Sequence, residues 1–106
     1  MTFKEYQESA AKVPLSLRNN RERVDLPVLG LQEEAGKVGS LLTTAFSSGR
    51  LALTSKQRED LQDRLSHVLW SVALLSVEAG ITMEDLATHS LAQLSAMAKD
   101  LDPDQR

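Results

Sequence analysis

The stretch between Thr54 and Gly80 constrains the fold of this chain more than any other. It opens with Thr54 and Gln57, the spacing of a capping box in which each side chain satisfies a backbone N–H of the other residue. Leucine and valine then recur every three or four residues until the glycine, a residue that often ends helices. Because the segment is apolar around a wide arc, a helix formed by it needs cover on more than one side.

Further segments repeat apolar residues at helical spacing. We expect the first helix over residues 2–12, closed by Pro14, which cannot continue it. The last helix should open at Thr82, with a frayed acidic tail over residues 100–106. These boundaries predict helices joined by short connections.

The second helix is expected to begin near Asp25, with Pro27 accommodated in its first turn. Its apolar stripe continues to Ala45, and Gly49 is the expected C-terminal stop. Before it, residues 14–25 are polar and basic and predict a solvated loop or arm over the core. The alternative is an arm that binds phosphate through its arginines, which are Arg18, Arg21 and Arg23.

The amino-acid composition agrees with packed helices and argues against several classes of function. Only 4% of the 106 residues are aromatic, so leucine, valine and alanine must form the core. The net charge of −3 gives no electrostatic case for nucleic-acid binding, and the lack of cysteine excludes disulfides and thiolate metal sites. No apolar signal core or membrane-spanning run appears. We therefore expect one cytoplasmic domain over residues 1–106, an all-α antiparallel four-helix bundle that self-associates, with no nucleic-acid or membrane partner.

Polar residues interrupt the apolar faces of the second and third helices. Glu34 lies within the stripe of the second helix, with Lys37 one turn later. Arg64 lies within the stripe of the third, and His67 follows one turn on. Charged groups on inward faces are costly unless they are paired, so this parallel placement predicts a polar site between the two helices.

Three motifs resemble those of the MazG-type nucleotide pyrophosphohydrolases, over roughly residues 30–94. These are Gly30-Leu31-Gln32-Glu33-Glu34-Ala35-Gly36, His67-Val68-Leu69-Trp70, and Gly80-Ile81 followed by Met83-Glu84-Asp85-Leu86. The resemblance implies an all-α domain that oligomerises through its helices, as a homodimer or a tetramer. It also implies an ancestral Mg²⁺ site, with carboxylates from facing helices, that splits a nucleoside triphosphate into monophosphate and pyrophosphate.

The chain departs from this family at the positions that carry the chemistry. Lys37, Arg64 and His67 stand where the family has acidic metal ligands, so with Glu34 these positions sum to +1. Glu33 brings the site only to neutrality. Such a constellation should repel Mg²⁺, and we expect an interhelical Glu34–Arg64 salt bridge instead.

The last helix departs as well. The family's N-L-x-K-L pattern, whose Asn and Lys approach the nucleotide, corresponds here to a run with Ser90 and Gln93 in those two places. One alternative is a substitute metal site, displaced by a turn and built on Asp60, Asp63 and His67. In a working enzyme, Glu33 and Glu34 would bind the metal with help from Asp60 or Asp63. Simple surface pairing of these residues, including Asp60 with Arg64, is the plainer interpretation.

Three functions follow from these patterns. The favoured one is a catalytically degenerate MazG-like protein that needs no cofactor and serves as an interaction or regulatory module, binding a protein partner or its own copy. The second is a metal-independent binder of a nucleotide or other phosphorylated ligand, through Lys37 and Arg64 with Ser90 and Gln93. The third is an active Mg²⁺-dependent nucleoside triphosphate pyrophosphohydrolase.

Overall fold

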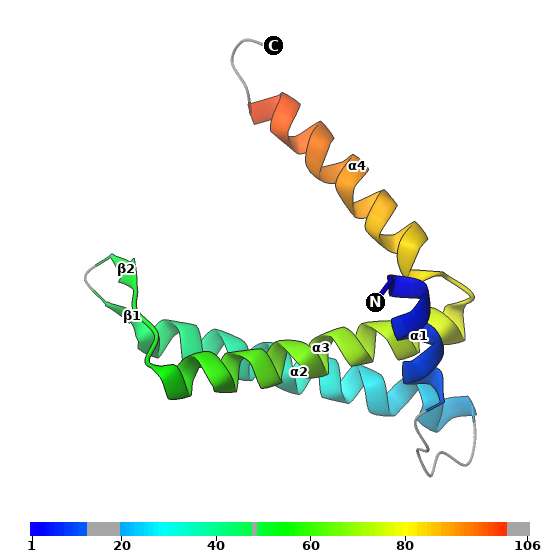
Figure 1. The fold of residues 1–106 in the computed structure, drawn as a ribbon, viewed down its shortest axis with the longest axis horizontal. Helices are drawn as coiled ribbons and strands as arrows, with labels where there is room; N and C mark the ends of the chain where they lie inside the picture. Colours follow the sequence, from blue (N-terminus) through cyan, green and yellow to red (C-terminus); the bar gives the residue numbers. More distant parts are fainter. Residues whose placement is uncertain (13–19, 48, 102–106) are drawn as a thin grey trace.

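The computed structural model of the chain describes residues 1–12, 20–47 and 49–101. The described residues are predominantly helical, which confirms the all-α class (Figure 1). In chain order the elements are α1 (Phe3–Ala11), α2 (Asn20–Ala45), β1 (Phe46–Ser47), β2 (Arg50–Leu51), α3 (Ser55–Ala79) and α4 (Met83–Leu101).

The short helix α1 agrees with the sequence prediction to within a residue at each end. Thr2 caps it: the Thr2 hydroxyl accepts a hydrogen bond from the Glu5 backbone N–H at 3.1 Å, and the Glu5 carboxylate accepts one from the Thr2 N–H at 3.3 Å. This reciprocal capping box satisfies two backbone donors that a helix start otherwise leaves unpaired.

Helix α2 begins earlier than predicted. It starts at Asn20 rather than near Asp25, so residues 20–25, which we assigned to a loop or arm, are helical. Pro27 consequently lies inside the helix and not in its first turn. The prediction that the helix accommodates Pro27 is confirmed, but its predicted place in the first turn is wrong. The ring fixes a φ angle that is close to helical values. The rest of the predicted arm, residues 14–19, lies outside the described residues.

The end of α2 also differs from the prediction. The helix stops at Ala45, and Phe46–Ser47 pairs antiparallel with Arg50–Leu51 in a two-residue ribbon. Gly49 has φ of 75° and lies in the turn of this ribbon, so it does not end a helix directly. A positive φ suits glycine in either role, which is why the residue type alone did not separate the two.

Helix α3 has the boundaries that its sequence predicts. The Thr54 hydroxyl accepts from the Gln57 N–H at 3.1 Å, and the Gln57 side chain accepts from the Thr54 N–H at 2.9 Å, which confirms the capping box. At the other end Gly80 has φ of 71° and donates its N–H to the carbonyls of Ser76 and Val77. This left-handed cap ends α3 and begins the turn toward α4.

Helix α4 starts after Thr82, whose hydroxyl accepts a hydrogen bond from the Asp85 N–H at 3.0 Å. The helix continues to Leu101, so the frayed tail predicted from residue 100 does not include residues 100 and 101. Residues 102–106 lie outside the described part of the chain.

The helices are arranged as a hairpin with a projecting arm (Figure 1). Helices α2 and α3 run antiparallel and pack along most of their lengths, while α1 lies against the end of α3 and the start of α4. The α3–α4 pair is bent by 107°, and α4 then extends away from the hairpin. Within one chain, the described helices therefore do not close into a four-helix bundle.

The core formed by these helices is small. It joins α1, α3 and α4 through Ala10, Ala73 and Met83, with Tyr6 and Trp70 packed against it. No large side chain among the described residues is completely buried. Among the same residues, no single helix is long and apolar enough to cross a membrane. Helices α3 and α4 meet these two criteria only when they are taken together, as a bent pair.

Candidate functional site

The polar site between α2 and α3 is built around Glu34 and Arg64. Glu34 lies on the α3-facing side of α2, where it meets Arg64, and Leu31 and Val38, one turn away on either side, are half-buried as it is. Arg64 Nη1 donates to both Glu34 carboxylate oxygens, at 3.4 Å and 3.3 Å. The Glu34 side chain is 12% exposed and that of Arg64 29%. The interhelical salt bridge predicted from the sequence is present.

Two further groups complete this cluster. Arg64 Nε lies 3.4 Å from an Asp60 carboxylate oxygen, one turn earlier on α3, as the surface-pairing interpretation expects. His67 Nδ1 lies 3.6 Å from Glu34 Oε1, so among the described ion pairs the His67 partner is Glu34 rather than Asp63. The guanidinium is thus held between carboxylates of two helices, and its charge offsets theirs where water is partly excluded.

Lys37 belongs to a separate, outward-facing pair. Its Nζ lies 3.0 Å from Glu33 Oε1, and both side chains are largely exposed. The hydrogen bond and the positive charge of Lys37 lower the pKa of Glu33 below its ordinary value. The two glutamates of the motif therefore serve different partners, Glu33 a lysine on its own helix and Glu34 an arginine on the facing helix.

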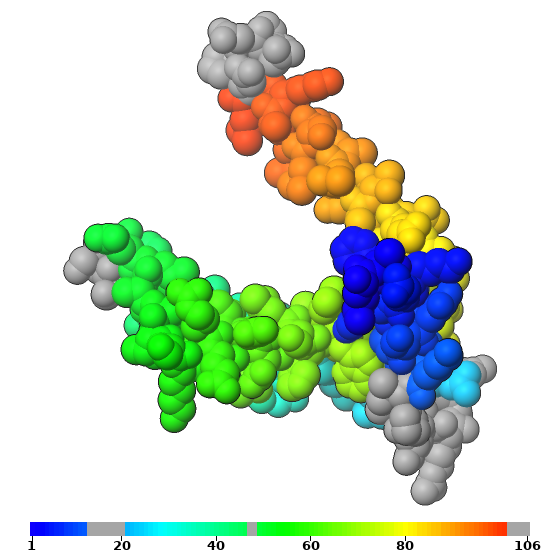
Figure 2. All heavy atoms as spheres, viewed as in Figure 1, coloured from blue at the N-terminus to red at the C-terminus, as the bar shows by residue number. Residues whose placement is uncertain are grey.

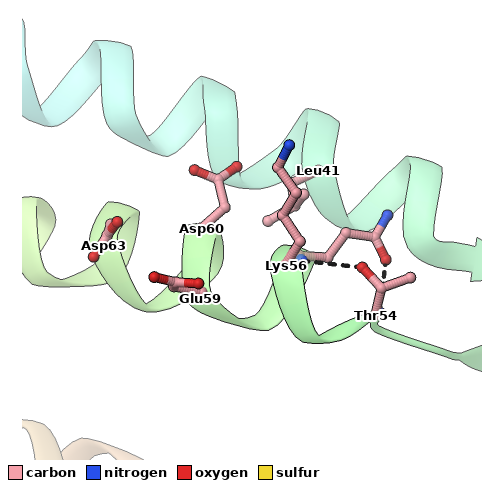
Figure 3. A pocket seen from close by; sticks show the side chains of 7 residues that line it. Leu41, Thr54, Lys56, Glu59, Asp60 and Asp63 are labelled. Carbon is pink, nitrogen blue, oxygen red and sulfur yellow. Dashed lines mark hydrogen bonds between the residues drawn. The ribbon is translucent and has the colours of Figure 1, made fainter.

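The residues present do not fit the magnesium site that the family resemblance implies. A hard divalent cation needs several converging oxygen ligands, and here a guanidinium already occupies the space between Glu34 and Asp60. Figure 3 shows Asp60 turned toward α2, whereas the carboxylates of Glu59 and Asp63 lie along the exposed side of α3. Among the described residues, no three acidic, histidine or cysteine side chains form a group suited to a metal ion.

A pocket of about 350 Å³ adjoins the salt bridge. Glu34 and His67 form its polar edge, and the rest of its wall is mainly apolar, contributed by Leu26, Pro27, Gly30, Trp70, Ser71 and Leu74. Our sequence interpretation did not identify this pocket. Gly30 lies on its wall, and a Cβ added there would meet the Ser71 hydroxyl at 3.4 Å, an ordinary contact distance, so this glycine was no clear signal of the pocket.

Trp70, on the wall of this pocket, has a hydrogen-bond donor without a partner among the described residues. Its indole Nε1 is buried and has no hydrogen-bond acceptor among the described residues, although the ring packs against the small core. Buried indole N–H groups usually find a partner. The sequence alone indicated core or interface for this residue, and the ring has the first of these positions.

The structure does not bring the predicted ligand-binding residues together. Ser90 and Gln93 lie on the projecting part of α4, away from the α2–α3 hairpin that carries Lys37 and Arg64 (Figure 1). Within a single chain the α3–α4 bend therefore separates the two halves of the predicted four-residue site. Of the predicted arm, Arg21 pairs with Asp25 at 2.9 Å, and Arg18 lies outside the described residues.

The chain matches no family model, and comparison with curated proteins and with solved structures gave no match.

Proposed function

We propose that this chain is a catalytically degenerate MazG-like protein, a non-hydrolysing interaction or regulatory module in which glutamate–arginine and glutamate–lysine pairs replace the ancestral nucleotide and magnesium site. The observation that carries the proposal is the position of the Arg64 guanidinium, between the Glu34 and Asp60 carboxylates. A cation that is part of the chain serves there as the counter-ion.

The charge balance of the cluster supports this proposal. Glu34 and Asp60 contribute two negative charges, and Arg64 neutralises one of them without any metal. Admitting Mg²⁺ would require Arg64 to leave a site where it has two carboxylate partners. The substitution therefore holds the two helices together while weakening the field that would attract a divalent cation.

A metal-independent phosphate binder is the second candidate, and the contacts favour it less. Lys37 and Arg64 are the cations it needs, and each already lies beside a carboxylate, at 3.0 Å and 3.3 Å respectively. A phosphate would have to displace these partners. Ser90 and Gln93, its other proposed contacts, are on α4 and outside the cluster.

We further propose that the protein is cytoplasmic and acts as a homodimer or tetramer. A different protein is a second candidate partner. What supports self-association is the large exposure of apolar side chains on α3 and α4, because soluble monomers rarely leave such surfaces open.

The experiment that tests the proposal is pyrophosphate release from a panel of ribo- and deoxyribonucleoside triphosphates, with Mg²⁺ or Mn²⁺. Glu34→Gln is the matched control, since it removes the charge of the one glutamate directed at the facing helix and keeps its shape. We expect no release above the control from protein shown to be folded by circular dichroism. Metal-dependent release that disappears in Glu34→Gln would overturn the proposal in favour of an active enzyme.

A thermal-shift measurement separates the first two candidates. The proposal predicts a melting temperature that nucleotides do not change, with or without a chelator. Stabilisation by nucleotide that persists in chelator, weakens with salt and disappears in Lys37→Ala/Arg64→Ala would establish the phosphate binder instead.

A further inference from the structure

The outer part of α4 exposes a row of large apolar side chains. Leu91, Leu94, Met97 and Leu101 are between 55% and 74% exposed. At 100° per residue these four fall within an arc that also holds Met83, Ala87, Ala98 and one polar residue, Ser90, whereas the charged residues of α4 and His89 lie outside it. The helix is therefore amphipathic over its whole length.

This apolar face is continuous with the core. Met83, at the start of the arc, is 4% exposed and packs with Ala10 and Ala73. The same face of the helix then emerges from the core and continues along the arm without any cover from the described residues (Figure 1). A helix face that is exposed to water usually carries polar and charged residues. This face is mainly apolar, which is the composition of a buried face.

A second open apolar surface lies on α3. A shallow groove along this helix is lined by Leu61, Leu65 and Leu69 with Arg58, Gln62 and Ser66. Leu69 also lines the hollow at the junction with α1 and α4, beside Phe3 and Glu84. The groove therefore begins at the corner of the bend and runs outward along α3.

The two surfaces match in length. At 1.5 Å per residue, the exposed row from Leu91 to Leu101 is about 15 Å long, and the groove from Arg58 to Leu69 is about 17 Å long. Because the α3–α4 pair is bent by 107°, the arm of a chain rises from the corner at a steep angle and does not pack along the groove of the same chain. Figures 1 and 2 show the arm standing clear of the α2–α3 hairpin, so it does not cover the α3 groove of its own chain.

The solvent-accessible surface of the chain indicates how much area a single copy leaves unburied. The chain exposes 8208 Å², whereas a compact monomer of 11.7 kDa exposes about 5,900 Å². Its radius of gyration is 17.1 Å, against about 13 Å for a compact domain of this length. The excess is roughly 2,300 Å² per chain, or about 4,600 Å² for a pair, which is within the total area that obligate dimer interfaces bury.

We propose that α4 is an exchanged arm: the apolar face of α4 in one copy occupies the α3 groove of a second copy, and the second copy returns the same contact. A two-fold pair of this kind covers both surfaces at once and leaves neither arm free to add further subunits. This deepens the self-association within the proposed function, but it is independent of whether the Glu34–Arg64 cluster hydrolyses nucleotides, so the two fail separately.

The experiment is light scattering after size-exclusion chromatography, with wild-type protein, Leu94→Glu in the arm, and Leu65→Glu in the groove. Ala96→Glu is the matched control, because it adds the same charge to the opposite face of α4. We expect a dimer for the wild type and for Ala96→Glu, and a shift to monomer for each of the other two. Circular dichroism establishes that each variant keeps its helix content; both substituted leucines are at least half exposed, so neither change opens the core.

Mixing the two monomeric variants tests the exchange itself. A heterodimer of Leu94→Glu with Leu65→Glu has one arm–groove contact that is entirely wild type, whereas each homodimer has a charge in both contacts. We therefore expect the mixture to recover dimer that neither variant forms alone. Arm-to-arm pairing would show no such recovery and would overturn the exchange.

Scattering of the wild type distinguishes the other occupants. A monomer with a radius of gyration near 13 Å would mean that α4 folds back on its own chain. A monomer near 17 Å would mean that another partner, such as a different protein or a lipid surface, covers the arm. Either result overturns the proposal, and a dimer unaffected by Leu94→Glu does so as well.

Discussion

Arg64 of α3 donates to both carboxylate oxygens of Glu34 on α2, so the two longest helices of the chain are joined by an ion pair at the place where the resemblance implies a metal. Both side chains are mostly shielded from water, at 29% and 12% exposure. Ion pairs in such positions matter less for their own attraction than for the cost of leaving one partner unmatched.

Truncating one partner should therefore destabilise the protein. We expect Arg64→Met to lower the free energy of unfolding by about 1–2 kcal/mol, because it leaves Glu34 without its cation in a partly dry position. Lys56→Met, a change of the same kind at an exposed site on α3, should have little effect. Urea unfolding at a single protein concentration measures both.

The double variant Glu34→Gln/Arg64→Met sharpens this prediction. If the cost of Arg64→Met comes from an uncompensated carboxylate, removing that charge as well should recover part of the loss. The double change should then cost less than the two single changes added together. Simple additivity would show that Arg64 stabilises the protein through its packing alone.

Gln7 should fix the junction between α1 and α4. Its side-chain amide donates to the Ile81 carbonyl at 3.0 Å and accepts from the Met83 N–H at 3.1 Å, which bridges the turn before α4. We expect Gln7→Ala to cost about 1–2 kcal/mol and to speed hydrogen exchange at the Met83 amide. The neighbouring exposed change Glu8→Ala should leave that amide protected.

Two glycines should respond to alanine with opposite signs. Gly80→Ala should destabilise the protein by about 1 kcal/mol, because a Cβ is strained at φ of 71°. Gly36 is inside α2 with open space around its Cα, so Gly36→Ala should stabilise by about 0.5–1 kcal/mol. Thermal unfolding of the two variants beside the wild type measures the difference.

The Glu33 carboxyl should titrate below its ordinary value. The Lys37 side chain lowers its pKa in the folded state, so the pair's contribution is present above the ordinary glutamate pKa and is lost as the pH falls through the lowered value. Carbon-detected NMR titration should show this pKa rise toward the ordinary value in Lys37→Gln. An unchanged Glu33 titration in that variant would contradict the assigned cause.

Local sequence signals predicted a large share of this fold. The capping box at Thr54 and the helix-ending glycine at Gly80 each involve residues within about a turn of one another, so their geometry follows from short-range chemistry. Glu34 and Arg64 were also predictable as partners, because helical spacing places each inside an apolar stripe and two such stripes must face each other.

What the sequence by itself determined is therefore which four segments are helical, where most of these helices begin and end, and that Glu34 must pair with Arg64. The tertiary structure alone decided the direction of α4 and with it the separation of Ser90 and Gln93 from the Glu34–Arg64 cluster. The physical reason is distance along the chain: the turn before α4 is held by Gln7, 74 residues away from Ile81, and no local pattern specifies such a contact. Local periodicity shows that a helix has an apolar face, and only the arrangement in space shows whether its own chain covers that face.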